Sequence, residues 1–179
     1  INSNYMKIIK NLYILIFIVI IFFSCDQLSE PEQKAVKMSR EELAKTIGFT
    51  WFNVYIDDYT PNDSLAHIID SLFDRNNHKL IFFLEPECTC KELVKDPAYL
   101  VNILDHANIT ENNYEFWGMG TPNADNPYKE IIQIKDLPHI AFINSGNYVY
   151  SILDSFYKYK VYKKWILENV IIDALEKNK

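Results

Sequence analysis

The 179-residue sequence has few of the residues that define fibrous, disordered or disulfide-rich chains. Its 4 glycines and 7 prolines are too few for a collagenous or low-complexity protein, and its 3 cysteines are too few for a disulfide-stapled mini-domain. The net charge of −6 argues against a general nucleic-acid binder. Apolar residues are abundant: 49% of the chain is hydrophobic and 15% aromatic, which suits one domain with a sizeable core.

The N-terminal segment has the pattern of an export signal. Lys7 and Lys10 follow Met6, and an apolar run extends from Leu12 to Phe23. The run is shorter than the roughly 18 residues expected of a membrane-spanning helix, and a basic start before a short apolar run is typical of a secretory signal peptide. We therefore expect residues 1–24 to be a signal peptide whose translation starts at Met6. The alternative is an uncleaved helical anchor.

The end of the apolar run carries a second signal. The stretch Phe22-Phe23-Ser24-Cys25 resembles the bacterial lipobox, with Phe22 where leucine is usual. The resemblance implies cleavage before Cys25, attachment of a lipid to Cys25, and a periplasmic domain held to a membrane of the cell envelope. Residues 25–38 are polar, and we expect them to form a flexible tether between the lipid and a domain over residues 39–179.

The rest of the chain alternates between strand and helix patterns. Ser39 and Glu42 form a capping-box pattern that predicts a short helix ended by Gly48. Strands are expected at Thr50–Ile56, Lys79–Leu84, Tyr114–Gly118, His139–Asn144 and Tyr148–Leu153, and helices at 61–74, 90–107, 126–134 and 159–176. This order predicts an α/β fold whose central mixed sheet is largely parallel, gains an antiparallel C-terminal hairpin and is flanked by helices.

Two cysteines stand where a buried strand meets a helix. Cys88 and Cys90 follow the apolar strand Lys79–Leu84 and precede or open the next helix. Free N–H groups and the positive dipole end at a helix N-terminus stabilise a thiolate relative to a thiol. This position therefore favours a reactive cysteine.

The cysteine segment and a later proline together resemble the thioredoxin superfamily, especially membrane-tethered thiol–disulfide proteins. In that superfamily the strand ends in a PxCxxCK stretch, and a proline with a cis peptide bond precedes the fourth strand and lies against the cysteines. Pro138, in Asp136-Leu-Pro-His-Ile-Ala-Phe-Ile143, matches that proline. The resemblance implies a thioredoxin-like fold from about Phe49 to the C-terminus.

The sequence departs from the superfamily in two ways. Cys88 and Cys90 have one residue between them instead of two, so a disulfide between them is expected to be strained and easily reduced. The strand before them also lacks the acidic residue that is often buried there. In addition, Glu85 and Glu87 oppose thiolate formation at Cys88 by like-charge repulsion.

Three functions are compatible with these residues. The first is thiol–disulfide exchange with protein thiols and disulfides of the envelope, without a cofactor: Cys88 attacks, Cys90 resolves, and Pro138 shapes the peptide-binding face. The second is a copper or zinc carrier similar to the Sco-type proteins, with Cys88, Cys90 and His139 as ligands. The third is a non-catalytic binding module that retains the fold. The lysines at 158, 160, 163 and 164 are interpreted as a solvated helix face.

Overall fold

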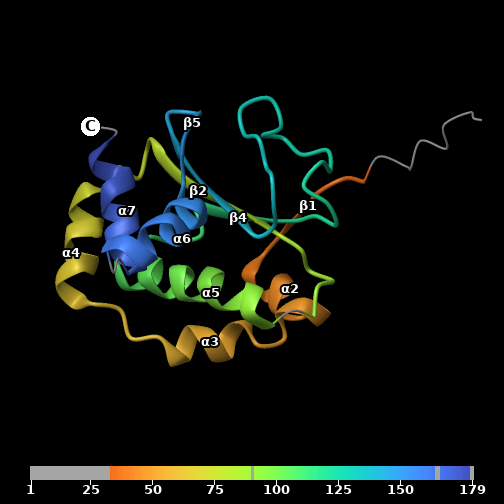
Figure 1. The fold of residues 1–179 in the computed structure, drawn as a ribbon, viewed down its shortest axis with the longest axis horizontal. Helices are drawn as coiled ribbons and strands as arrows, with labels where there is room; N and C mark the ends of the chain where they lie inside the picture. The colour runs from red at the N-terminus through yellow and green to blue at the C-terminus, as the bar shows by residue number, and fades with distance from the viewer. Residues whose placement is uncertain (1–32, 90, 164–165, 178–179) are drawn as a thin grey trace, which may run out of the picture. The chain divides into compact units, whose positions relative to one another are not determined.

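The computed structural model describes residues 33–89, 91–163 and 166–177 (Figure 1). The predicted signal peptide and Cys25 lie outside these residues, as does Cys90. The elements in chain order are β1 (Val36–Met38), α2 (Arg40–Ala44), the 3₁₀ helix η1 (Ile47–Phe49), α3 (Phe52–Asp58), α4 (Asp63–Leu72), β2 (His78–Leu84), α5 (Lys91–His106), β3 (Tyr114–Gly118), β4 (His139–Asn144), β5 (Asn147–Ser151), α6 (Ile152–Lys163) and α7 (Leu167–Glu176).

The fold is α/β, with a five-stranded mixed sheet in the order β1-β3-β2-β4-β5. Only β2 and β3 pair in parallel, through the crossover helix α5, and the other three pairs are antiparallel. The prediction of a largely parallel sheet is therefore wrong. The reason is that the connection from β3 to β4 contains no helix within residues 119–138 and returns β4 antiparallel to β2.

The first strand of the sheet falls inside the segment expected to be a tether. Val36–Met38 pairs antiparallel with β3, and the Ala35 N–H donates to the Asp125 carbonyl at 2.8 Å. This edge strand is three residues long and largely exposed, so its sequence carries no alternation that would have predicted it. The folded unit accordingly begins at Gln33 instead of Ser39.

The strand predicted at Thr50–Ile56 is a helix, α3. Phe52 and Ile56, four residues apart, are both buried, and the Phe52 ring contacts Phe49 and Phe116 edge-on at 5.7 and 6.0 Å. Packing of these two side chains against α5 overrides the strand preference of aromatic and β-branched residues. The capping box before it is confirmed: the Ser39 hydroxyl accepts from the Glu42 N–H, and the Glu42 carboxylate from the Ser39 N–H. That helix ends at Ala44, before Gly48.

The C-terminal part differs from the prediction in two further places. The helix expected at 126–134 is a series of turns, in which the Asn126 side chain accepts from the Tyr128 N–H at 2.9 Å. The closing helix is two helices, α6 and α7, and α7 begins after Ile166, whose backbone is extended. The hairpin is confirmed, with a two-residue turn at Ser145 and Gly146 in which both residues have positive φ, 51° and 80°.

The two faces of the sheet are covered differently. Leu80, Phe82 and Leu84 of β2 belong to a large cluster that includes buried residues of every described helix, whereas Ile81 and Phe83 belong to a smaller one. Within the described residues, no member of the smaller cluster comes from a helix. We call these the helix-covered face and the loop-covered face, since residues 119–138 cover the second; in Figure 1 that segment lies on the side away from α3 and α5.

Candidate functional site

The candidate site lies at the carboxyl end of β2. Every residue from Leu80 to Leu84 is buried, and the chain then turns through residues 85–89 before α5 begins at Lys91. The Cys88 N–H donates to the Glu85 carbonyl at 3.2 Å, which closes this turn. Cys88 is half-buried and carries a free thiol. Cys88 therefore lies partly exposed just before a 16-residue helix.

Two glycines allow the cysteine turn to dock closely on the domain. The Gly48 N–H donates to the Pro86 carbonyl at 2.8 Å, and a Cβ on Gly48 would lie 2.5 Å from the Cys88 carbonyl oxygen. On the other side, a Cβ on Gly118 would lie 2.7 Å from the Pro86 ring. Any larger residue at Gly48 would displace backbone atoms of the turn that holds Cys88. The sequence pattern marked Gly48 only as a helix end and missed this contact.

Pro138 and Cys88 lie at the same end of the sheet. The Leu137–Pro138 peptide bond is cis and immediately precedes β4, the neighbour of β2. Pro138 and Cys88 line the same small cavity, of about 10 Å³, together with Phe49, Glu85, Leu93 and Val94. This space holds about one water molecule at most, so the site is a contact surface and not a substrate-enclosing pocket.

The two glutamates near Cys88 lie in unequal surroundings. Glu85 is half-buried and lines the cavity, whereas Glu87 is exposed to solvent, which screens its charge. Lys91 begins α5, and the described residues of β2 contain no carboxylate beneath the cysteine. Among the described side chains, Glu85 is the charged group that shares a cavity with Cys88, and the start of α5 follows it.

His139, the third ligand of the metal interpretation, faces a different way. Its ring packs beside Phe83 at 6.2 Å and Tyr148 at 6.5 Å, and it is 4% exposed. Phe83 belongs to the loop-covered face, whereas Phe49 and Val94 beside Cys88 belong to the helix-covered cluster. Burial lowers the pKa of His139 more than Asp154 raises it, so the ring is neutral at pH 7. Its Nε2 atom has no hydrogen-bond partner among the described residues.

No three potential ligands gather elsewhere in the described part of the chain: His, Cys, Asp and Glu residues form no group suited to a metal ion there. Cys90 lies outside that part, so this statement does not cover the set of Cys88, Cys90 and His139.

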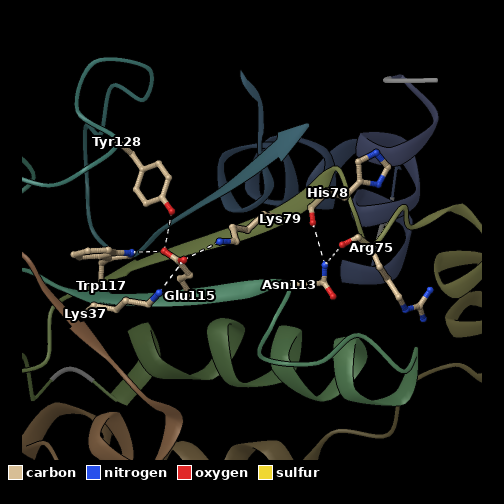
Figure 2. A network of polar contacts seen from close by, with 8 residues as sticks. All are labelled: Lys37, Arg75, His78, Lys79, Asn113, Glu115, Trp117 and Tyr128. Atoms are coloured by element: carbon tan, nitrogen blue, oxygen red, sulfur yellow. Dashed lines mark hydrogen bonds and ion pairs between the residues drawn. The ribbon is translucent and has the colours of Figure 1, made fainter. Parts of the chain in front are cut away.

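A second polar cluster, which the sequence analysis missed, lies on the loop-covered face (Figure 2). One carboxylate oxygen of Glu115 accepts from Lys37 at 2.9 Å and Lys79 at 2.8 Å, and the other from the Trp117 indole at 2.9 Å and the Tyr128 hydroxyl at 2.7 Å. Burial opposes ionisation of Glu115, but these four hydrogen bonds outweigh it and lower its pKa to about 2. The signal in the sequence that could have indicated this cluster was Glu115, the one acidic residue in the strand YEFWG. Because both oxygens are fully used, the cluster is structural.

Searches of protein-family models, curated proteins and solved structures find no match to this chain. Among the described residues, none of the helices combines the length and the apolar character that crossing a membrane requires.

Proposed function

We propose that this protein is a thioredoxin-like thiol–disulfide oxidoreductase that acts through Cys88 and Cys90. The observation that carries the proposal is the shared cavity of Cys88 and Pro138 at the carboxyl end of a central strand, beside the start of α5. A reactive thiol benefits from the N–H groups of a helix N-terminus, and half-burial leaves the Cys88 sulfur accessible to a partner. A cis proline before β4 agrees with the superfamily resemblance.

The reaction transfers two electrons between two pairs of cysteines. The Cys88 thiolate attacks one sulfur of a partner disulfide, the partner S–S bond breaks, and the released partner sulfur takes up a proton. The Cys90 thiolate then attacks the Cys88 sulfur of the mixed disulfide and releases the second partner sulfur as a thiol. The partner is reduced and Cys88–Cys90 is oxidised; the reverse sequence oxidises the partner.

Single serine variants test this assignment of roles. In Cys90→Ser the resolving thiol is absent, so mixed disulfides with partner proteins should accumulate, whereas Cys88→Ser should trap few. The pair should have a reduction potential above the roughly −300 mV of structural disulfides, because one intervening residue strains the ring. Mass spectrometry after equilibration in glutathione buffers measures the trapped mixed disulfides and the reduction potential of the pair. Two thiols that no glutathione buffer can join would contradict the proposal.

The proposed location is the bacterial envelope, with the domain tethered through a lipid on Cys25. Ser24-Cys25 after the apolar run supports it. Cys25→Ser expressed in a bacterium should lose incorporation of labelled lipid and its membrane association. An unchanged mass with full membrane retention would instead indicate an uncleaved helical anchor.

One observation favours metal binding as a second candidate. The Nε2 atom of His139 is buried and has no hydrogen-bond partner among the described residues, so together with Cys88 and Cys90 it could serve as an imidazole ligand for Cu(I) or Zn(II). The different faces of His139 and Cys88 make this the weaker candidate. Anaerobic titration of the reduced chain with Cu(I) should give one tight equivalent that Cys90→Ser abolishes; unchanged binding in His139→Ala would remove the histidine from the site. If neither exchange nor metal binding is measured, the non-catalytic binding module remains.

A further inference from the structure

A groove lies beside the candidate site, between α5 and α6. Its volume is about 470 Å³, within the usual range for ligand pockets, and it is bordered by Tyr59, Leu93, Lys95, Tyr99, Phe156 and Lys160. We call it the α5–α6 groove. Leu93 also lines the small cavity that contains Cys88 and Pro138. A chain segment that reaches Cys88 could therefore extend directly into the groove.

The groove is walled by aromatic rings that the fold holds in place. Tyr59 stacks on Tyr99 with ring centroids 4.5 Å apart, and the Tyr59 hydroxyl donates to the buried carboxylate of Glu168 at 2.8 Å. On the α6 side, the Tyr157 hydroxyl donates to Asp96 of α5 at 2.7 Å. Aromatic side chains fixed in this way contribute contact area at little further entropic cost when a partner binds.

Positive charge accompanies these rings. The Lys95 ammonium lies 5.4 Å from the Tyr99 ring centroid, and the Lys160 ammonium lies 4.9 Å from that of Phe156. Asp96 is the carboxylate among the described residues that border the groove, and it accepts from Tyr157. Lys95 and Lys160 place positive charge beside the rings, which favours negative groups of a ligand.

Apolar side chains that border the groove are partly exposed at its α6 side. Tyr157 is 49% exposed and Ile166 41%. Apolar groups beside cations fit a segment that combines carboxylates with an aromatic or aliphatic residue. A concave groove suits an extended peptide better than the flat surface of a bilayer.

We propose that the α5–α6 groove docks an acidic segment, containing an aromatic or aliphatic residue, of the protein that exchanges disulfides with Cys88. The carboxylates pair with Lys95 and Lys160, and the apolar residue packs on Tyr99 and Phe156. The identity of the occupant as the redox partner rests on the proposed function; the binding preference of the groove does not.

A binding measurement with peptides that contain no cysteine tests the groove independently of disulfide exchange. The full chain in non-ionic detergent is titrated against two fluorescent nine-residue peptides of phenylalanine, serine and glutamate, one of which has glutamine in place of every glutamate. We expect the acidic peptide to bind at least about tenfold tighter than the glutamine peptide, because charged contacts distinguish them. Equal affinities, or no binding of either peptide, would overturn the proposal.

Paired charge reversals identify the surface responsible. Lys95→Glu/Lys160→Glu should lose about tenfold or more in affinity for the acidic peptide. Lys45→Glu/Lys135→Glu makes the same change in net charge at exposed positions away from the groove and should stay within about twofold. Equal losses in both pairs would indicate a general charge effect and overturn the proposal.

Two further experiments separate a failure of the proposed function from a failure of the groove assignment, and peptide binding from membrane contact. The same peptides with one serine replaced by an activated cysteine report the exchange rate at Cys88: acidic-peptide binding without any exchange would contradict the proposed function and leave the groove assignment intact. Amine labelling of the full chain in neutral and anionic vesicles tests a membrane contact. Protection of Lys95 and Lys160 only in anionic vesicles, with no peptide binding, would make the face a membrane contact and overturn the proposal.

Discussion

The helix-covered and loop-covered faces of the sheet are held under their coverings by different interactions. On the first, long apolar side chains of the strands pack against helices, as Phe116 of β3 does against Phe52 of α3. On the second, no described helix is present, and a charged carboxylate, Glu115, fixes the covering segment through Tyr128. Helices supply a preformed apolar surface, whereas a turn-rich segment needs directional hydrogen bonds to hold one arrangement.

This difference bears on the candidate site because the site lies between the two coverings. Cys88 lines its cavity together with Phe49 and Val94 of the helix-covered cluster, while Pro138 is the last residue of the loop-covering segment before β4. The position of Cys88 therefore depends on the helices, and that of Pro138 on the segment held by Glu115. Perturbing one face should change the site differently from perturbing the other.

The largest effect is expected from truncating neighbouring phenylalanines on opposite faces. Phe82 and Phe83 are both fully buried, so alanine at either should lower the free energy of unfolding by about 3–5 kcal/mol, with Phe82→Ala at the upper end. The reason is that the packed helices cannot collapse into the cavity as readily as residues 119–138 can. Urea denaturation measures both; a larger loss in Phe83→Ala would mean that the loop-covered face is the more rigid one.

Removing the Glu115 carboxylate should have the next largest effect. Glu115→Ala leaves Lys37, Lys79, the Trp117 indole and the Tyr128 hydroxyl without their acceptor, and we expect a loss of about 2–4 kcal/mol. Glu111→Ala, at an exposed position on the preceding turn, is the matched control and should change stability by less than about 0.5 kcal/mol. Equal small effects in the two variants would show that the cluster is not a stabilising contact.

Much of the helix-covered face could be predicted from sequence, because long periodic runs such as those of β2 and α5 carry a clear signal. Two elements, α3 and β1, were not predicted. Phe52 and Ile56 have strand-like composition but pack at helical spacing, and nothing local distinguishes the two outcomes. β1 is too short to show alternation, and its place beside β3 depends on pairing that is distant in the chain.

The candidate site was likewise predicted from the sequence only in part. The cysteine turn after an apolar strand was visible in the sequence, and Pro138 was identified through the superfamily resemblance. The close approach of Gly48 to the Cys88 carbonyl was not foreseeable, because it joins segments forty residues apart. The orientation of His139 toward Phe83 follows from the pairing register of β2 and β4, which the sequence does not encode locally.

Acidification should weaken the loop-covered face selectively. The pKa of Glu115 is about 2, below its ordinary value of about 4.5, so its ionised form stabilises the fold above pH 4.5. That contribution is lost as the pH falls from about 4.5 to 2, because Glu115 of the unfolded state takes up a proton in this range while the folded state keeps it ionised. Glu115→Gln should be less stable than the wild type at pH 7, and the difference should shrink toward pH 2. Urea midpoints across this range measure it; a constant difference would contradict the assignment.

The smallest effect is expected from Tyr128→Phe, which removes one hydroxyl and keeps the ring. Burial and Glu115 raise the pKa of Tyr128, so its hydroxyl stays protonated and donates at any pH near neutrality. Loss of this one hydrogen bond should cost about 1 kcal/mol globally. Locally the change should be larger: the Tyr128 hydroxyl joins residues 119–138 to Glu115, whereas Lys37, Lys79 and Trp117 bind Glu115 from the strands. Amide hydrogen exchange should therefore accelerate within 119–138 and stay unchanged in α5.

Tyr59→Phe removes a comparable hydrogen bond, to Glu168 on the helix-covered side, and should leave exchange in 119–138 unaltered. Uniform acceleration in both variants would show that the two faces unfold together, and the comparison between them would then hold for structure but not for dynamics.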